Sequence, residues 1–437
     1  MLSTADRLAL SDEQTFQDPA QVHAIFSAMR KEEPVAWCPE PWGGPGFWSV
    51  TKYDDIQHVS RLPKVFSSDA RQGGITLPDE TMIRNRRGGP QEFDKQFEEQ
   101  TKVFENGRSM IVMDPPEHNQ HRRMVAPGFT PLKLEAMIPH IRQRCIEIID
   151  GTLGAKLDSG REYGECEFVA AVAAELPIQM LAELFGSPQS ERHKLFEWSN
   201  IIIGGDDPDI ASSQEQVMAA MMEMAGYAMQ LHAQRKATPG DDLISMLVNT
   251  QVDGQEMSWA DYLSAFILLV VAGNETTRNS ISGGMQALSL HPAELKKLTD
   301  NPALIPQAID EIIRWVSPVV YMRRTALEDA VVGGQQIRKG DKLALWYMSG
   351  NRDEDKWADP FTFNVTRNGP RHLSFGYGQH LCIGWRLAEI QLTVAIEEFL
   401  KRCPEFEVVG PINRMRTNFL NSIKRMTLKY KPVQIAA

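Results

Sequence analysis

One stretch of the sequence, FGYGQHLCIG at residues 375 to 384, sets a single cysteine among three glycines, a histidine and a phenylalanine. Such a loop could cradle a phosphate, carry a nucleophilic Cys–His pair or present a thiolate to a metal. The phosphate interpretation is weak because the stretch has no lysine and follows no clear nucleotide-binding strand. A nucleophilic pair of Cys382 with His380 has no evident third group to orient it.

The residues around Cys382 favour a thiolate. Apolar residues at helical spacing from Trp385 to Leu400 predict a helix, and a helix N-terminus stabilises a negatively charged sulfur. Gly376, Gly378 and Gly384 allow sharp turns and close approach, so that backbone amides can point at the sulfur. A single thiolate with no second protein ligand nearby suits an iron that is already carried by a porphyrin.

FGYGQHLCIG matches the haem-ligand signature of the cytochromes P450 at every fixed position, and the chain therefore resembles this family of haem-thiolate monooxygenases. The resemblance implies haem b as cofactor, with Cys382 as the iron ligand, Gly384 beside it and Phe375 shielding the sulfur from water. It spans about residues 15 to 430. We therefore expect one large domain over residues 1–437, with a short N-terminal tail of about residues 1–15.

A second motif, AGNETT from Ala272 to Thr277, lies within a predicted helix at about residues 258–290. Glycine and threonine are unfavourable in mid-helix, and threonine hydroxyls can bond to carbonyls of the preceding turn, so we expect an interrupted turn here. Taken alone, the motif is a tolerated weak spot. The resemblance implies instead a dioxygen groove at Ala272, with Glu275 and Thr276 as the acid–alcohol pair that delivers protons.

A third motif, EIIR, places Glu311 and Arg314 on one helix face. Such a pair is most often a solvated ion pair. The resemblance implies a structural lock that maintains the haem pocket, with a partner within Asn351–Asp353 or Pro360–Arg367.

His118 and Arg122 lie one turn apart on a helix predicted to begin after Pro115-Pro116, and two donors on one face suit the two carboxylates of haem. The resemblance adds His380 and Arg324 to this set. Whether Arg323 or Arg324 contacts haem stays open, although the following Thr-Ala favours Arg324.

The segments AGNETTR and TNFLNSIKRM look like the branch of the family that oxidises steroids, branched lipids, terpenoids and alkanes. The expected reaction inserts one oxygen atom of O2 into a C–H bond of an apolar steroid, terpenoid, alkane or fatty-acid-like substrate. Two alternatives are a peroxide-using peroxygenase and a non-catalytic haem sensor or carrier, neither of which needs the Glu275–Thr276 pair. The expected pocket residues are Ile111, Val112, Val271, Val319, Val320, Met322 and Phe419.

The chain contains no glycine-rich flavin or nicotinamide fingerprint, so electrons must come from a separate ferredoxin, or flavodoxin, with its reductase. A basic patch on the cysteine side would attract an acidic partner. Its candidates are Arg122, Arg123, Arg371 and Arg386.

The elements that must position these groups are mostly helical. Apolar spacing predicts further helices at 131–153 and 214–232, whereas strand-like segments are short, at 46–51, 330–337, 342–346, 406–409 and 427–430. The expected fold class is mainly α with a small β portion. Two polar, glycine-rich stretches, Arg84–Pro90 and Gly204–Asp209, are expected to be loops.

Composition excludes several classes of protein. A net charge of −11 argues against a nucleic-acid partner. No signal peptide is evident, and the longest apolar run, Ala265 to Ala272, is far shorter than the roughly 20 residues that span a bilayer. We expect a soluble, cytoplasmic monomer. The five cysteines are an odd number and lie far apart, which argues against disulfides and a zinc site: Cys38, Cys145, Cys166, Cys382 and Cys403.

Overall fold

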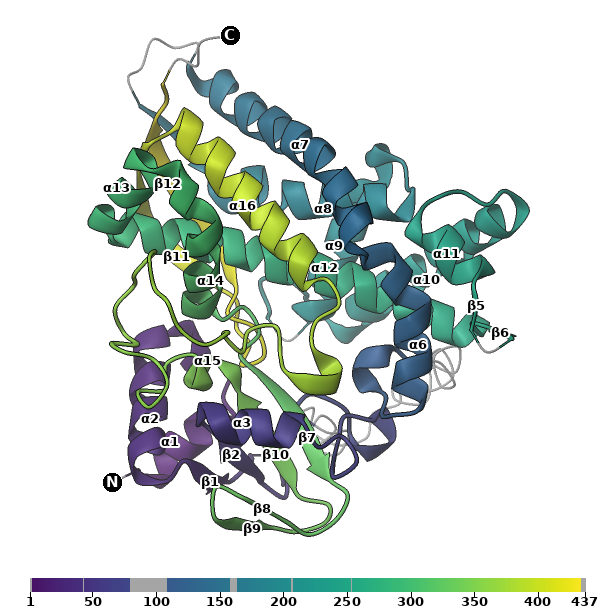
Figure 1. Ribbon diagram of the computed structural model, residues 1–437, viewed down its shortest axis with the longest axis vertical. Helices are drawn as coiled ribbons and strands as arrows, with labels where there is room; N and C mark the ends of the chain where they lie inside the picture. Colours follow the sequence, from purple (N-terminus) through teal and green to yellow (C-terminus); the bar gives the residue numbers. More distant parts are fainter. Residues whose placement is uncertain are drawn as a thin grey trace.

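The computed structural model describes residues 2–41, 43–78, 108–157, 163–205, 207–252 and 254–433. Helices make up most of the described chain (Figure 1). The stretch 84–90 lies outside the described residues. The helices are α1 (Thr4–Ala9), α2 (Pro19–Glu32), α3 (Tyr53–Ser60), α6 (Glu117–Val125), α7 (Pro131–Leu157), α8 (Glu175–Phe185), α9 (Arg192–Ile203), α10 (Gln214–Ala237), α11 (Leu243–Asn249), α12 (Trp259–Leu290), α13 (Pro292–Asp300), α14 (Ile305–Val316), α15 (Tyr347–Gly350) and α16 (Trp385–Arg402).

The strands are short. Most belong to a five-stranded sheet in the order β1-β2-β10-β7-β3 and a three-stranded sheet in the order β11-β12-β4; β5–β6 and β8–β9 are separate hairpins. The strands are β1 (Val35–Cys38), β2 (Phe47–Val50), β3 (Phe66–Ser67), β4 (Gly164–Glu167), β5 (Gln251–Val252), β6 (Gln255–Glu256), β7 (Tyr321–Ala326), β8 (Ala330–Val332), β9 (Gln335–Ile337), β10 (Lys342–Trp346), β11 (Glu405–Arg414) and β12 (Ile423–Lys431).

The long helix α12 runs through the middle of the fold (Figure 1). It begins where the Ser258 hydroxyl accepts a hydrogen bond from the Asp261 amide at 3.1 Å, which satisfies a free amide of the first turn. Its first half packs with α8 to α11 through residues such as Phe266, and its second half packs with α7, α14 and α16 through residues such as Met285. Residues 272–277 therefore lie between two hydrophobic clusters.

The predicted fold class, mainly α with a small β portion in one domain, is confirmed. The helices predicted at 131–153, 214–232, 258–290 and 385–400 correspond to α7, α10, α12 and α16. The predicted strands correspond to β2, the β8–β9 hairpin, β10, β11 and β12. Strand β7 is not predicted, because its sequence YMRRTA lacks the apolar–polar alternation of a half-buried strand.

The N-terminal tail and the predicted loop Gly204–Asp209 both contact the rest of the fold. The N-terminal stretch contains α1, and Leu10 just beyond it is fully buried. In the stretch Gly204–Asp209, Asp207 is buried and accepts hydrogen bonds from the Lys424 ammonium at 2.8 Å and the Arg416 amide at 2.9 Å.

The five cysteines are all free thiols. Among the described helices, none is both long and apolar enough to cross a membrane.

Candidate active site

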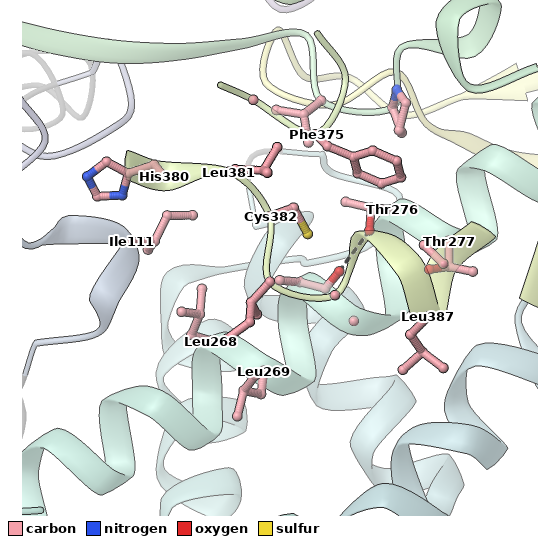
Figure 2. Close-up of a pocket in the computed structure, with 18 of the residues that line it drawn as sticks. Ile111, Leu268, Leu269, Thr276, Thr277, Phe375, His380, Leu381, Cys382 and Leu387 are labelled. Carbon is pink, nitrogen blue, oxygen red and sulfur yellow. Dashed lines mark hydrogen bonds between the residues drawn. The ribbon is translucent and has the colours of Figure 1, made fainter. Parts of the chain in front are cut away.

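Cys382 lies in the loop that leads into α16, and its sulfur faces a cavity between this loop and α12 (Figure 2). The Cys382 amide donates to the Phe375 carbonyl at 2.9 Å, which closes the loop into a turn. Burial among protein atoms raises the pKa of the thiol, whereas the Gly384 amide and the positive charge of Arg122 lower it. Those two groups stabilise the thiolate form that a metal requires.

Two glycines of this loop are needed for their backbone conformation, and the third contributes its amide. Gly376 and Gly378 have left-handed backbone, with φ of 72° and 69°. At Gly378 a Cβ atom would stand 2.5 Å from the Ser60 carbonyl oxygen, so a larger residue would push the loop away from α3. Gly384 has φ of −90°, which any residue adopts, and its contribution is the amide beside the sulfur.

The four side chains predicted to hold the haem carboxylates all line the same cavity. His118 and Arg122 come from α6, Arg324 from β7 and His380 from the short 3-10 turn Gly378–His380. The His118 and His380 rings are 4.5 Å apart between centroids. The Nε2 atom of His380 is buried and has no hydrogen-bond partner.

The guanidinium groups of this cluster are positively charged, and no carboxylate of the described residues pairs with them. Among the described residues, neither Arg122 nor Arg324 belongs to an ion pair. Burial lowers the pKa of Arg122. Burial, with the nearby charges of Arg324, His118 and Arg122, lowers the pKa of His380 to about 2. A ligand with two carboxylates fits such a cluster, because it supplies acceptors for the buried donors.

Strand geometry separates the two adjacent arginines of β7. Arg324 faces the cavity, and its Nη1 donates to the Arg323 carbonyl at 2.7 Å. The Arg323 guanidinium points to the other side, where it donates to the carbonyls of Gln72 at 3.2 Å and Thr76 at 3.3 Å. Successive side chains of a strand point to opposite faces, so only one of the two can line the cavity.

Gln379 is a site residue that the sequence did not indicate. Its side-chain amide donates to His118 Nδ1 at 2.9 Å and also contacts the Asn119 side chain. A neutral His118 ring that accepts this hydrogen bond at Nδ1 carries its proton on Nε2. Only the fold brings α6 next to the cysteine loop, and no spacing in the sequence points to this contact.

One face of α12 forms the cavity wall opposite Cys382. Leu268, Ala272, Thr276 and Ser280 follow one another at intervals of four residues, and Leu269 lies beside them, so they share a helix face. Figure 2 labels Leu268, Leu269 and Thr276 of this face. The two leucines are not among the predicted pocket residues, although their spacing from Ala272 places them on the same helix face.

Thr276 and Glu275 occupy different environments although they are adjacent. The Thr276 hydroxyl lines the cavity and donates to the Ala272 carbonyl at 2.8 Å, while α12 continues without the expected interruption (Figure 2). Glu275 is fully buried away from the cavity lining and pairs with Arg278. Burial raises the pKa of Glu275, and the Arg278 charge opposes this rise. Its Oε1 atom has no hydrogen-bond partner.

The predicted pocket residues divide into two groups. Ile111, Val319 and Met322 line the cavity, whereas the structure does not bring the other four to it. Val271 precedes Ala272 and is rotated to another face of α12, and Val112 follows Ile111 in the same way. Val320 and Phe419 belong to the hydrophobic cluster of the five-stranded sheet. Lining residues not predicted include Ile75, Met110, Phe129, Leu181, Leu184, Leu268 and Leu269.

Glu311 and Arg314 form a fully buried ion pair at the end of α14. Arg314 donates through Nε and Nη2 to both Glu311 oxygens, at 2.6 and 2.8 Å, and through Nη1 to the Asn351 carbonyl at 2.7 Å and the Pro360 carbonyl at 3.1 Å. Arg367 adds an ion pair to Glu311 at 3.0 Å. Both stretches named from the sequence therefore contact the pair.

The pair is linked to the cysteine loop through one side chain. The Asn351 amide donates to the Ser374 hydroxyl at 2.8 Å, and its oxygen accepts from the Leu373 amide at 2.6 Å. Ser374 precedes Phe375, the first residue of the motif around Cys382. The lock thus fixes the start of the loop that carries the thiolate.

A thiolate opposite a helix with a threonine-containing groove, beside a cluster of two histidines and two arginines, defines a haem-thiolate monooxygenase. The chain belongs to the cytochrome P450 family: the model of the family described as "Cytochrome P450" matches residues 80–431.

The relatives and solved structures carry related names. Linalool 8-monooxygenase of Pseudomonas putida is 38% identical over 94% of this chain and 96% of its own length. Methyl-branched lipid omega-hydroxylase of Mycobacterium tuberculosis is 36% identical over 93% of this chain and 90% of its own length. A Mycobacterium marinum cytochrome P450 solved in complex with pseudoionone is 32% identical, with a TM-score of 0.83, covering 95% of this chain and 96% of that one.

The predicted class, a haem-thiolate monooxygenase, is confirmed by these matches in preference to a peroxygenase or a carrier, and haem b is the cofactor of the family. The structure fits this group on two observations. Within the described part of the chain, His380 Nε2 is buried without a hydrogen-bond partner, and neither Arg122 nor Arg324 has a carboxylate partner, so all three can donate to the haem carboxylates. The sulfur of Cys382 faces the same cavity.

Proposed function

We propose that this monooxygenase hydroxylates an apolar terpenoid, branched lipid or steroid. The observation that carries the proposal is the aliphatic wall of the cavity, to which α12 contributes Leu268 and Leu269 and the region around β7 contributes Val319 and Met322. Linalool 8-monooxygenase, methyl-branched lipid omega-hydroxylase and steroid C26-monooxygenase are relatives whose names describe such substrates. Aliphatic pockets discriminate weakly between ligands that differ by a methylene, so the class is broad.

Titration of the holoenzyme with linalool, a methyl-branched fatty acid, a steroid and a small aromatic acid tests this class. We expect the first three compounds, and not the aromatic acid, to shift the haem absorption spectrum as water is displaced. A response to the aromatic acid alone would contradict the proposal.

The site residues have separate roles in this proposal. Cys382 ligates the haem iron, and His118, Arg122, Arg324 and His380 bind the two haem carboxylates. Bound haem supplies a thiolate-ligated iron that activates dioxygen for insertion into a C–H bond. Replacing Cys382 by serine is expected to abolish the red-shifted carbonyl band of the reduced protein, and retention of that band would exclude Cys382 as the ligand.

Proton delivery is assigned to Thr276 and Glu275. The Thr276 hydroxyl donates to the Ala272 carbonyl, so its oxygen can accept a hydrogen bond from a water in the cavity. Glu275 has a raised pKa and pairs with Arg278, and it reaches the cavity only by turning away from that partner. Glu275 therefore acts as a proton carrier that moves between Arg278 and Thr276.

Thr276→Ala tests this assignment. The variant is expected to bind substrate and consume reductant at a comparable rate, yet to release much of the flux as hydrogen peroxide. The measurement is product formed per reductant consumed. Thr393→Ala is the matched control, because the Thr393 hydroxyl donates to the Glu389 carbonyl at 2.7 Å within α16 and does not line the cavity. Equal coupling in Thr276→Ala and the parent would mean that protons take another route.

Electrons are proposed to come from a ferredoxin, or a flavodoxin, that docks on the cysteine side of a cytoplasmic monomer. Arg386 is exposed in the first turn of α16, and Arg371 stacks on Trp385 at 4.2 Å. Arg386→Glu should raise the KM for an acidic ferredoxin and leave substrate affinity unchanged. Arg425→Glu, an exposed arginine on β12, is the control.

A further inference from the structure

A second cleft lies between the start of α2, the C-terminal half of α12, the end of α14, the segment after α15 and the connection that joins β11 to β12. Among the described residues, it shares no lining residue with the active-site cavity. Leu290 and Phe361 line it and are 65% and 46% exposed, so the cleft opens to solvent. Arg352 and Asn279 also line it and are only 3% and 1% exposed. Its rim is therefore apolar and its floor polar.

Arg352 is a buried cation that forms no ion pair with the described residues, although the charge of Glu311 acts on it. Its Nη2 donates to the Trp315 carbonyl at 2.7 Å, and its guanidinium stacks over the Trp315 ring at 4.8 Å. Its Nη1 is buried and has no hydrogen-bond partner. Burial first, and then the charge of Arg314, lowers the pKa of Arg352 to about 9. No carboxylate of the described residues forms an ion pair with it.

A second guanidinium in the cleft is also unbalanced. Arg414 donates to the Asn421 side-chain oxygen at 2.9 Å and to the Gln286 side-chain oxygen at 3.1 Å, both neutral amides. Burial lowers its pKa. The one carboxylate among the described lining residues is Asp18, which is exposed and accepts from the Ala20 and Gln21 amides at the start of α2.

Two more polar atoms in the cleft lack partners. Asn279 Nδ2, a donor, and His23 Nδ1 are both buried and make no hydrogen bond. Burial lowers the pKa of His23 well below its usual value, and the charges of Arg352, Arg30 and Arg414 lower it further. The positive potential therefore reaches the His23 ring. Buried donors and charges left without acceptors destabilise the fold unless a ligand satisfies them.

We propose that this cleft is a second binding site, which takes a small organic carboxylate. The carboxylate oxygens accept hydrogen bonds from the guanidinium groups of Arg352 and Arg414 and from Asn279, and the apolar part of the ligand lies against Phe361 and Leu290. A planar guanidinium matches the geometry of a carboxylate, which favours this anion over chloride. The apolar rim favours an organic anion over inorganic phosphate.

The test uses the holoenzyme at constant ionic strength, titrated with butyrate, acetate, phosphate or chloride while the thermal unfolding temperature and the haem absorption spectrum are followed. A ligand of the folded state raises that temperature saturably. We expect butyrate to do so more tightly than acetate or phosphate, with no spectral change. A spectral change would place the ligand in the active site, and tighter binding of phosphate, or no saturation by butyrate beyond chloride, would overturn the proposal.

Variants connect the response to the cleft. Arg414→Gln removes one charged donor, and we expect butyrate to bind at least about tenfold more weakly. Arg425→Gln removes an exposed arginine of β12 outside the cleft and should leave the affinity unchanged. An unaltered response in Arg414→Gln would overturn the proposal.

Because Arg352 packs on Trp315, its replacement can impair folding, so Asn279→Asp is the second variant. It introduces a carboxylate of the protein into the lining of the cleft, where we expect it to compete with the ligand for the two guanidinium groups. We expect this variant to lose the butyrate response while its unfolding temperature without ligand is at least that of the parent. A full butyrate response in Asn279→Asp would contradict the proposed position of the carboxylate.

Discussion

Two buried glutamate–arginine pairs in this enzyme have the same spacing and different surroundings. Glu311 and Arg314 use both carboxylate oxygens and all three guanidinium nitrogens, and Glu311 also accepts from the Asn364 amide at 2.9 Å. In the pair of Glu275 and Arg278, Arg278 Nη2 contacts the carboxylate, and both Glu275 Oε1 and Arg278 Nε are buried without a partner.

The difference shows that hydrogen bonding, and not spacing, determines what such a pair does. A fully satisfied pair is fixed, because moving either partner leaves several buried groups unbonded. A pair with fewer hydrogen bonds loses fewer of them when its two side chains separate. The incomplete pair is adjacent to Thr276 on the cavity wall, where a mobile proton carrier is useful, and the complete pair lies at the start of the cysteine loop, where rigidity is useful.

The largest expected effect follows from breaking the complete pair. Glu311→Gln leaves Arg314 without its buried counter-charge, and we expect a loss of about 3–5 kcal/mol in the free energy of unfolding. Denaturant unfolding and the yield of the red-shifted carbonyl band measure the loss of stability and of the haem site. A variant as stable as the parent would mean that the neighbouring backbone contacts suffice.

The corresponding change in the incomplete pair should affect catalysis more than folding. Glu275→Gln is expected to keep the carbonyl band and substrate affinity while oxygenated product forms about 10²- to 10⁴-fold more slowly, as for loss of a general acid. Single-turnover product formation is the measurement. A haem loss as large as in Glu311→Gln would remove the distinction between the two pairs.

The pH dependence of stability provides a smaller test. The pKa of Glu275 is raised above the ordinary value of 4.5, so between that value and the raised one the folded protein binds more protons than the unfolded chain. Stability should therefore fall as pH rises through this window, by at most about 1.4 kcal/mol per pH unit. In Glu275→Gln this contribution disappears. Unfolding free energies from pH 5 to 8 measure the two slopes, and identical slopes would contradict the raised pKa.

The smallest expected effect is that of Arg278→Lys, which we compare with Arg314→Lys. Arg278 makes one hydrogen bond to Asn200 and one to Ser422 besides its contact with Glu275, so Arg278→Lys should cost about 1 kcal/mol or less. Arg314→Lys removes a fork that reaches four acceptors and should cost several times more. Thermal unfolding of both variants gives the ratio, and equal losses would show that the two arginines are equivalent.

Much of the site can be predicted from the sequence, because its motifs are local. The cysteine loop, the α12 motif and the EIIR pair each occupy a few consecutive residues, and helical spacing assigns their faces. The contact of Gln379 with His118 and the two unpartnered atoms of the Glu275–Arg278 pair depend on how distant segments pack. Such contacts leave no periodic signal, so the sequence alone could not distinguish the two pairs.

The predicted pocket residues show that the sequence also cannot determine which single side chains face the cavity. Val319 and Met322 line the cavity but Val320 does not, and Ile111 lines it but Val112 does not. Apolar character identifies the segment, whereas the direction of each side chain follows from the local backbone, which a run of adjacent apolar residues does not reveal.

The neighbouring arginines of β7 also limit where this chain can be recombined with its relatives. The strand pairs with β10 on one side and β3 on the other, so its register is fixed from both edges. A chimera that gained or lost one residue within Tyr321–Ala326 would turn Arg324 away from the cavity and turn Arg323 into it. Library designers should place crossovers outside this strand. In the turn between β8 and β9, a Cβ atom at Gly333 would stand 2.5 Å from Val35, whereas Gly334 has open space around it, so a length change is better placed at Gly334.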